Sequence, residues 1–579
     1  MKFSESPILA LRLPVWRARL MLIGFIGAFL LLLGRAAYLQ AMNEDFLQAK
    51  GESRYSRVLE VPATRGKILD RNGDALAIST PVKSIWAIPE DVEASRSELT
   101  QLAKLLDVSA EDLRKRIADT KRDFVYLKRQ VAPDVADRVA LLGIPGIHQS
   151  REYRRYYPGG EVMAHVLGFT NADDVGQEGI ELAFQEHLAG QPGSRRVIKD
   201  RRGHIVEDVE SIKAARDGKD LVLALDSRIQ SLAFGQLREA IKSHRARGGA
   251  IVVLDVRTGE ILALVNLPTY NPNNRAGLTG AQLRNRAVTD MFEPGSTLKP
   301  VTVALALERG QVTPKTTVNV APGSLTIGPA TIRDAHYKKE DAALTVAEVI
   351  QKSSNVGSAK LALELPAEAM YEWFHDIGFG SAPQLGFPGE AAGRVRPYQN
   401  WRPIEQATMS YGHGITVSLV QLARAYTVFA QDGVLMPLSL LKVDQPPAGK
   451  RVISAQTAQA VRRMLELAVQ PGGTGPRAQI MGYRVAGKTG TAHKLVDGRY
   501  ARDKYVASFV GFAPASDPRL VIAVMIDEPQ GSNYYGGLVA APVFANVMSG
   551  SLRRLGVSPD APMEPIKLPP PEAEIRESV

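Results

Sequence analysis

The longest apolar stretch of the chain lies near its beginning. Residues 20–34 read LMLIGFIGAFLLLLG without a charge, and beyond Arg35 the apolar pattern continues to Leu39. Residues 20–34 alone have the length of a signal-peptide core, but with Arg35 reaching to the interface the whole stretch is long enough to cross a bilayer. Because Leu39-Gln40-Ala41 is a poor cleavage site, we predict an uncleaved transmembrane helix over residues 20–39.

The charges before this stretch indicate its orientation. Arg12, Arg17 and Arg19 precede the apolar run, and basic residues next to a membrane span stay on the cytoplasmic side. We therefore expect residues 1–19 in the cytoplasm, a single pass through the inner (cytoplasmic) membrane, and the rest of the chain in the periplasm.

The segment from residue 40 to residue 224 is polar and has few long apolar runs. Asn72-Gly73 separates two strand-like pieces and is typical of a tight hairpin turn, and residues 96–115 have the pattern of a helix. The segment shows no nucleophile, base and orienting group at useful spacing. We interpret it as a mixed pedestal or dimerisation-type domain without a catalytic role.

The hydrophobic pattern changes near residue 221. An amphipathic helix is predicted over residues 227–244, with Ser227 as its possible cap, and a last helix over residues 543–555. Strand-like segments stand at the two ends of the region, at residues 221–226, 249–255, 260–265, 483–487, 506–513 and 520–527. Strands at both ends of a largely helical middle predict a mixed sheet, and hence an α/β (α+β) domain over residues 225–557.

Composition narrows the classes of protein that remain. With 579 residues, 45% of them hydrophobic and 23% charged, the chain can form two or more domains. It contains no cysteine, which excludes disulfides and thiolate metal sites. The net charge of +10 favours contact with lipid headgroups or an acidic cell-wall polymer, and because no recognition motif is present we expect no nucleic-acid partner. Residues 558–579, rich in proline and charge, are expected to be a disordered tail.

Candidate chemistry begins at Ser296, in the stretch Glu-Pro-Gly-Ser-Thr-Leu-Lys-Pro over residues 293–300. Glycine and proline before the serine and an apolar helical run after it place Ser296 at a helix N-terminus, where free N–H groups face an incoming oxygen. Lys299 lies one helical turn further on, on the same face, and a neutral lysine can take the proton of a serine hydroxyl. By itself this pattern is a weak signal, because it occurs on many helix surfaces.

Two further motifs strengthen the signal. Ser353-Ser354-Asn355 opens another apolar helical run, and Lys488-Thr489-Gly490-Thr491 ends a strand-like alternation. Ser-x-x-Lys, Ser-x-Asn and Lys-Thr-Gly in this order are shared by penicillin-binding proteins and class A β-lactamases. The three motifs together therefore predict an acyl-transfer site that needs neither a metal nor a cofactor.

The chain resembles the class B penicillin-binding proteins, which are peptidoglycan D,D-transpeptidases, and most of all their septal FtsI type. The resemblance is carried by the anchor, by RGKILDRNGDALA, AHVLGF and GQEGIE, by the three motifs, and by EQATMSYGHGITVSLVQLARAYTVFA, and it reaches about Leu555. It implies a pedestal followed by a transpeptidase domain with a five-stranded sheet between helical regions. The elongation-specific relatives share these features, so an elongation role stays open. No second glycosyltransferase domain fits in the remaining residues.

This resemblance implies a serine-type D-alanyl-D-alanine transpeptidase, with stem peptides as substrates and β-lactams as covalent ligands. Ser296 would attack the D-alanyl-D-alanine carbonyl, and Lys299 would act as the base if burial and a nearby cation keep it unprotonated. Lys488 would supply that cation and attract the substrate carboxylate. The remaining roles are a proton relay (Ser353), an amide contact (Asn355), carboxylate binding (Thr489, Thr491) and, by resemblance, an oxyanion hole from the N–H groups of Ser296 and Thr491.

Other residues near the motifs allow two interpretations. Tyr534 and Tyr535 resemble the aromatic wall beside the family's site, and with Gly490 they complete the predicted substrate-binding set. For His413 and His493 we favour a structural role over substrate contact. Glu293 is interpreted as a turn or salt-bridge residue rather than an acid catalyst.

Three alternatives and one partner remain to be weighed. Residues 482–489 fit the P-loop pattern G-x-x-x-x-G-K-[ST], but a P-loop needs a strand before its first glycine and a helix at its lysine. A β-lactamase would need a base that activates water, and no clear glutamate motif for it is present. A scaffold protein would have lost motif residues, whereas all are intact. By resemblance, the anchor and pedestal are expected to contact a division glycosyltransferase of the FtsW type and other division membrane proteins.

Overall fold

The computed structural model describes residues 14–39, 56–120, 122, 124–199, 205–335, 337–496, 498–531, 534–566 and 568. Helix α1 (Val15–Ala37) contains most of the predicted apolar run but begins five residues before the predicted start. All its residues are exposed, it is 23 residues long, and an 18-residue window within it has a mean hydropathy of 2.2, so the helix has the length and composition needed to cross a membrane.

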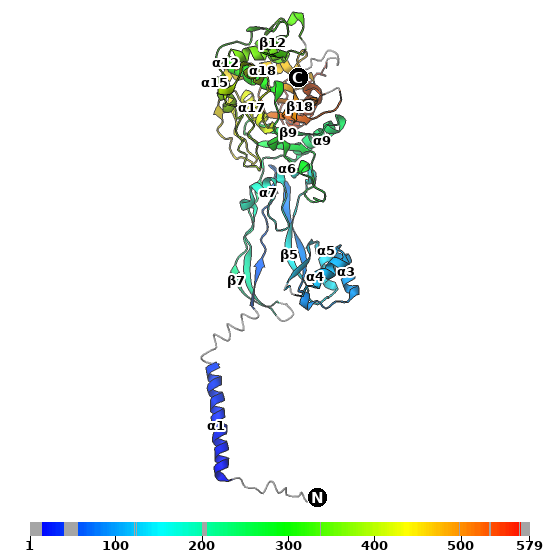
Figure 1. The fold of residues 1–579 in the computed structure, drawn as a ribbon, viewed down its shortest axis with the longest axis vertical. Helices are drawn as coiled ribbons and strands as arrows, with labels where there is room; N and C mark the ends of the chain where they lie inside the picture. The colour runs from blue at the N-terminus through cyan, green and yellow to red at the C-terminus, as the bar shows by residue number, and fades with distance from the viewer. Residues whose placement is uncertain are drawn as a thin grey trace.

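The pedestal, residues 56–222, is built on two small sheets. Figure 1 shows it as an elongated body, with α3, α4 and α5 gathered in a lobe beside β5. Strand β3 pairs with β2, β4 and β5, and β8 extends this sheet through β2, while β1, β6 and β7 form the second sheet. The strands are β1 (Ser56–Val61), β2 (Ile68–Leu69), β3 (Ala75–Ala87), β4 (Val125–Val131), β5 (Ile147–Tyr156), β6 (Gly193–Lys199), β7 (Ile205–Lys213) and β8 (Leu221–Val222). The helices are α3 (Arg96–Leu106), α4 (Ala110–Ile117), α5 (Pro133–Leu141), α6 (Ala164–Leu167), α7 (Gly179–Ala183) and α8 (Gln185–Leu188).

The single helix predicted over residues 96–115 is wrong, because the chain forms α3 and α4 there. Asp107 ends α3 in the left-handed conformation with φ 50°, and the Ser109 hydroxyl then caps α4 by accepting from its first N–H groups. The strand predicted over residues 221–226 is reduced to the two residues of β8.

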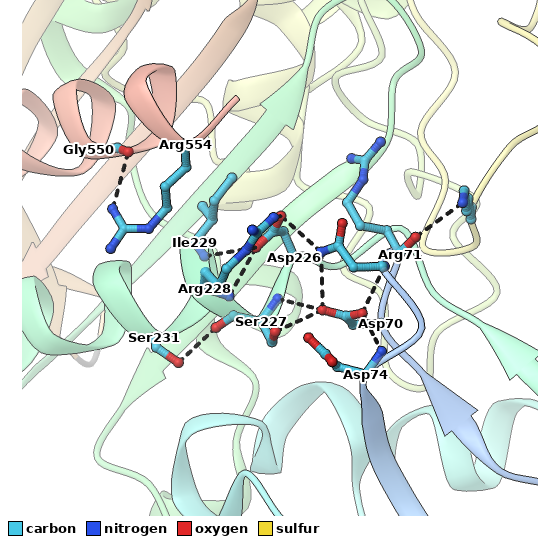
Figure 2. A network of polar contacts seen from close by, with 12 residues as sticks. Asp70, Arg71, Asp74, Asp226, Ser227, Arg228, Ile229, Ser231, Gly550 and Arg554 are labelled. Carbon is cyan, nitrogen blue, oxygen red and sulfur yellow. Dashed lines mark hydrogen bonds and ion pairs between the residues drawn. The ribbon is translucent and has the colours of Figure 1, made fainter. Parts of the chain in front are cut away.

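A polar junction joins the pedestal to the large domain (Figure 2). Asp70 accepts hydrogen bonds from the Asn72 and Asp74 N–H groups at 2.8 and 2.9 Å, which closes the predicted Asn72-Gly73 turn, where Gly73 has φ 93°. It also accepts the Ser227 hydroxyl at 2.7 Å. The cap of the following helix is Asp226, not Ser227, since its carboxylate accepts the Arg228 and Ile229 N–H groups.

Two of the stretches that carry the family resemblance meet inside the pedestal. The Glu181 carboxylate, fully buried, binds the guanidinium of Arg65 at 2.6 Å and that of Arg155 at 2.7 Å. Arg65 belongs to RGKILD and Glu181 to GQEGIE. A buried triad of charges therefore ties three distant segments of the pedestal together.

The large domain is organised around the implied five-stranded sheet, in the order β10-β9-β19-β18-β17 with every pair antiparallel. Its strands are β9 (Gly248–Asp255), β10 (Ile261–Leu267), β17 (Ala486–Val496), β18 (Arg499–Ala513) and β19 (Leu520–Asp527). Along β9, Ile251 and Val253 pack with helices α9 (Ser227–Ser243) and α20 (Ala541–Arg554), whereas Val252 and Leu254 face the helical region. Both faces are buried, which explains why these strands read as continuous apolar runs.

Helices and short strands enclose this sheet. The helices are α9 (Ser227–Ser243), α10 (Gly280–Leu283), α11 (Arg286–Thr289), α12 (Lys299–Glu308), α13 (Val346–Gln351), α14 (Asn355–Leu363), α15 (Ala367–Asp376), α16 (Pro403–Met409), α17 (Leu419–Ala430), α18 (Ala455–Val469), α19 (Gly536–Val539) and α20 (Ala541–Arg554). The short strands are β11 (Thr317–Asn319), β12 (Ser324–Ile327), β13 (Ala330–Arg333), β14 (Ala343–Thr345), β15 (Val434–Leu435) and β16 (Lys450–Arg451).

The beginning of the expected tail packs against the large domain. The Asp560 carboxylate accepts hydrogen bonds from the Arg484 N–H at 2.7 Å and from the Ser516 hydroxyl at 2.6 Å. The expectation of disorder therefore does not hold for the residues around Asp560, and residues 569–579 lie outside the described part of the chain.

Candidate active site

Ser296 lies in a tight turn just ahead of α12. The turn is a 3₁₀ helix, η5 (Gly295–Leu298), and Lys299 is the first residue of α12, so the serine precedes the α-helix instead of opening it. In 3₁₀ geometry, residues three apart lie on the same side. Ser296 is 3% exposed and Lys299 is fully buried.

A contact from α17 and one within the turn fix its backbone. The Tyr426 hydroxyl on α17 donates to the Thr297 carbonyl at 2.8 Å, and the Thr297 hydroxyl donates to the Pro294 carbonyl at 2.7 Å. Tyr426 and Thr297 are fully buried. The nucleophile candidate is therefore held by a rigid frame rather than by a free loop.

The Ser-x-x-Lys and Ser-x-Asn motifs are in direct contact. The Lys299 Nζ donates to the Ser353 carbonyl at 2.5 Å and to the Ser353 hydroxyl at 2.9 Å. Ser353 lies between α13 and α14 and adopts a left-handed backbone with φ 59°, which is unfavourable for a residue other than glycine. This conformation presents both oxygens of one residue to the same amine.

Asn355 is anchored through its backbone and leaves one side-chain oxygen without a partner. The Asp334 carboxylate accepts the Asn355 and Val356 N–H groups at 2.6 and 3.0 Å and the Ser354 hydroxyl at 2.6 Å, so it caps α14. The Asn355 Nδ2 donates to the Arg333 carbonyl at 3.3 Å, whereas its buried Oδ1 accepts no hydrogen bond. A buried unpaired acceptor is costly, and it is suited to an N–H that a ligand brings.

The Lys-Thr-Gly motif lies on β17, the edge strand of the sheet. The fully buried Lys488 donates from Nζ to the Thr474 and Thr489 hydroxyls at 3.3 and 3.2 Å, and these two hydroxyls are 2.7 Å apart. The Thr491 hydroxyl accepts the Gly536 N–H at 3.0 Å. A lysine amine and a row of hydroxyl groups thus stand together, which is an arrangement suited to a carboxylate.

Strand β17 passes within backbone distance of residues 294–298, which carry the candidate nucleophile Ser296 and form the nucleophile turn. A Cβ at Gly490 would lie 2.8 Å from the Pro294 carbonyl oxygen and 2.9 Å from the Thr297 methyl group, and a Cβ at Gly295 would lie 3.3 Å from the Thr491 carbonyl oxygen. Glycine at position 490 is therefore a condition for the close approach of the first and third motifs.

Tyr534 and Tyr535 form an aromatic stack with Tyr505 of β18. The Tyr505 and Tyr534 rings are parallel with centroids 3.9 Å apart, and the Tyr534 and Tyr535 centroids are 4.4 Å apart. His493 lies against Tyr505 at 4.7 Å and contacts the Ala501 carbonyl through Nδ1. The two tyrosines are thus packed side by side next to Gly536, which binds the third motif.

Burial favours the neutral form of the His413 imidazole. Burial of the imidazole, together with the nearby His493 and Lys299 side chains, lowers its pKa to about 4. Its ring lies 5.3 Å from the Tyr411 ring. The Tyr411 ring in turn lies beside Lys299, whose Nζ is 6.0 Å from the ring centroid.

Sequence reasoning missed Asp334 and Thr474. Asp334 contacts Ser354 but lies twenty residues before it in the sequence, and Thr474 contacts Lys488 from fourteen residues before it. Neither stands in a recognisable pattern, so the sequence held no signal for them. The P-loop alternative fails on geometry, because Lys488 lies inside β17 and pairs with Val510 of β18 where a P-loop opens a helix.

Comparison with known proteins agrees with this geometry. Residues 249–549 match the family described as "Penicillin binding protein transpeptidase domain", and residues 60–223 match the family described as "Penicillin-binding Protein dimerisation domain". The solved transpeptidase domain of penicillin-binding protein 3 from Burkholderia pseudomallei is 49% identical with a TM-score of 0.54, over 59% of this chain and 98% of that chain.

Curated relatives match almost the whole chain. The probable peptidoglycan D,D-transpeptidase PenA of Neisseria gonorrhoeae is 46% identical over 551 residues, which are 94% of each chain. The peptidoglycan D,D-transpeptidase FtsI of Escherichia coli strain K12 is 45% identical over 553 residues, 94% of this chain and 93% of the relative. The chain therefore belongs to the penicillin-binding protein family, as a class B D,D-transpeptidase with a dimerisation domain ahead of its transpeptidase domain.

Proposed function

We propose that this chain crosslinks peptidoglycan stem peptides through an ester on Ser296. The proposal rests on one observation. The buried Lys299 amine, one turn after Ser296, contacts both oxygens of Ser353. Complete burial disfavours a protonated amine, and a neutral amine is the form that accepts the serine proton. The attack releases the terminal D-alanine, and an amino group of a neighbouring stem peptide then takes the acyl chain from Ser296.

The oxyanion of the tetrahedral intermediate is assigned to the N–H groups of Ser296 and Thr491. The close approach of Gly295 to the Thr491 carbonyl supports this assignment, since it brings the two backbones together. Donors fixed in a buried site stabilise the developing charge without reorganisation. If water replaced the acceptor amine, the same ester would be hydrolysed as in a carboxypeptidase.

The remaining motif residues are assigned to substrate binding and proton transfer. Ser353 relays the proton towards the leaving nitrogen, and the unpaired Oδ1 of Asn355 accepts a substrate amide N–H. Lys488, with the Thr489 and Thr491 hydroxyls, binds the terminal carboxylate, and Gly490 lets β17 reach the turn. Tyr534 and Tyr535 would line the substrate site beside them.

A penicillin tests the nucleophile directly. Its strained amide and carboxylate imitate D-alanyl-D-alanine, so the full-length protein in detergent should gain the mass of one drug molecule. Ser296→Ala should abolish this gain, while Ser231→Ala, which removes an exposed hydroxyl on α9, should not. Labelling of Ser296→Ala at a single site would place the nucleophile elsewhere.

We further propose that the enzyme acts at the division septum and faces the periplasm. The support is the similarity to FtsI over nearly the whole chain and the apolar helix α1 near the first residue. A reporter that functions only outside the cytoplasm, fused after Val557, should be active. Depletion should give filaments; rounded cells would instead indicate the elongation role.

A division glycosyltransferase of the FtsW type is the proposed partner of the anchor and pedestal. Helix α1 is rich in Leu, Ile, Phe, Gly and Ala, which suits packing against another membrane helix. Replacing residues 1–39 with an unrelated single-pass anchor should impair septal crosslinking and leave penicillin labelling intact. Full complementation by that chimaera would remove the specific role of the anchor. The division of the chain at residues 19, 39, 224 and 557 stays a prediction.

A further inference from the structure

A polar bridge connects the β17–β18 hairpin to the segment that leads into the nucleophile turn. The Tyr500 hydroxyl lies 2.9 Å from Oε1 and 3.1 Å from Oε2 of Glu293, three residues before Ser296. The same Oε1 accepts the Gly414 N–H at 2.9 Å. One carboxylate therefore joins three segments that are far apart in the sequence: the hairpin, the loop at residues 411–414 and the approach to Ser296.

The loop at residues 411–414 rests directly on the nucleophile turn. Gly412 has φ 88°, and a Cβ there would lie 2.3 Å from the Gly295 carbonyl oxygen. The His413 ring lies 6.0 Å from the Tyr500 ring and 5.3 Å from the Tyr411 ring. Aromatic groups thus form a continuous layer from Tyr500 to the ring beside the Lys299 amine.

Apolar packing holds the outer end of the hairpin only weakly. Leu495 and Tyr500 are paired across the two strands, yet they are 52% and 49% exposed. The register of the two strands shifts between His493 and Leu495, immediately beyond the third motif. A strand pair that is exposed and irregular at this point depends on side-chain contacts for its position.

Both groups of the bridge have a raised pKa. Burial raises the pKa of Tyr500, and the nearby Glu293 carboxylate raises it further, so the hydroxyl stays a donor. Burial also raises the pKa of Glu293, while the Gly414 and Tyr500 hydrogen bonds oppose this rise. A hydroxyl that donates to a carboxylate makes a stronger hydrogen bond than a neutral pair does.

We propose that Glu293 and Tyr500 are positioning residues that hold the β17–β18 hairpin against the nucleophile turn. By doing so they set the separation of the Ser296 and Thr491 N–H groups, which must converge on the oxyanion as the ester forms. The bridge acts on the rate of acylation and leaves the affinity for the first, non-covalent complex nearly unchanged. This inference rests on the roles of Ser296 and Thr491 proposed above.

The test separates the acylation rate constant from the non-covalent dissociation constant, using a fluorescent penicillin and the full-length protein in detergent. Tyr500→Phe removes one hydroxyl and should lower the acylation rate constant about 3- to 30-fold, the range expected when a hydrogen bond to a charged group is lost at a half-exposed site. Tyr398→Phe is the matched control, because its hydroxyl also donates to a carboxylate, that of Glu368 at 2.7 Å. It should acylate within about twofold of the wild type.

Glu293→Gln and the double variant complete the test. Since the two side chains act through one contact, the double variant should be at most about twofold slower than the slower of the two single variants. Hydrogen exchange of the amides at residues 491–496 should be faster in Tyr500→Phe than in Tyr398→Phe, with both melting temperatures close to that of the wild type. If Glu293→Gln does not fold, Tyr500→Phe decides by itself.

Two results would overturn the inference. An unchanged acylation rate constant in Tyr500→Phe would show that the bridge does not position the site. A weaker non-covalent complex with an unchanged rate constant would make Tyr500 a ligand contact instead. Failure of the proposed function is distinguishable from both, because it would appear as labelling of Ser296→Ala.

Discussion

Replacement of Lys299 with methionine separates the proposed catalytic role of the amine from its structural role. Methionine has a similar length and stays apolar in this fully buried position. The substitution removes the donor of the hydrogen bonds to the Ser353 carbonyl and hydroxyl at 2.5 and 2.9 Å. If Lys299 is the base, general-base help worth about 10²–10⁴-fold is lost, which corresponds to about 3–5 kcal/mol of activation free energy.

The cost in stability should be smaller than the cost in rate. A buried acceptor left without a donor costs about 1–3 kcal/mol, and the Ser353 hydroxyl can rotate to another partner. We therefore expect the free energy of unfolding to fall by about 1–3 kcal/mol. The variant then remains folded while its acylation falls by at least about 100-fold.

The assay is acylation of the full-length protein by a fluorescent penicillin, followed in parallel with denaturant unfolding. Lys360→Met is the matched control, since the Lys360 Nζ on α14 also donates to a carbonyl, that of Asn319 at 2.6 Å. It should acylate at the rate of the wild type. Acylation of Lys299→Met within about tenfold of the wild type would refute the assignment of the base.

Three further substitutions test the close approach at Gly490, the buried charges of the pedestal and the junction between the two domains. Gly490→Ala would place a Cβ 2.8 Å from the Pro294 carbonyl oxygen, so β17 must move away and acylation should fall more than about tenfold; an unchanged rate would contradict the close approach. Glu181→Gln leaves the buried Arg65 and Arg155 without their counter-charge and should lower the free energy of unfolding by about 3–5 kcal/mol, measured by denaturant titration. At Asp226, burial would raise the pKa, but the hydrogen bonds from Arg228 and Asn72 lower it to about 2. The stabilisation of the folded state by this carboxylate is therefore complete above about pH 4 and is lost as the pH falls towards 2. Asp226→Asn should cost about 1 kcal/mol at pH 7, and the difference from the wild type should shrink between pH 4 and 2; a difference independent of pH would contradict this charge state.

The sequence by itself predicted the elements whose pattern is local. Both faces of the central sheet are buried, so the runs at residues 249–255 and 520–527 are apolar throughout and were placed within a residue of β9 and β19. The C-terminal helix followed from its 3.6-residue period and lies at Ala541–Arg554. The three motifs could be found because each is a short pattern of reactive and polar residues.

Local features misled the prediction where two signals overlapped. The helical pattern of residues 96–115 continues across Asp107, and only the left-handed backbone there divides it into α3 and α4. Asp226 and Ser227 are both good caps, and the choice between them depends on Asp70 of the pedestal, which binds the Ser227 hydroxyl. The strand that carries Lys488 was predicted to end near the motif, whereas β17 begins at Ala486 and continues to Val496.

Only the tertiary structure decided how the motifs meet. The sequence contains Lys299 and Ser353 but not their contact, because α12 and α14 must pack together before the amine reaches both oxygens. Asp334 and Thr474 carry no motif and gain their roles from the segments that pack against them. The bridge between Glu293 and Tyr500 joins residues 207 positions apart. Periodicity along the chain encodes which face of an element is buried, whereas the identity of its neighbour depends on packing among elements that no local pattern describes.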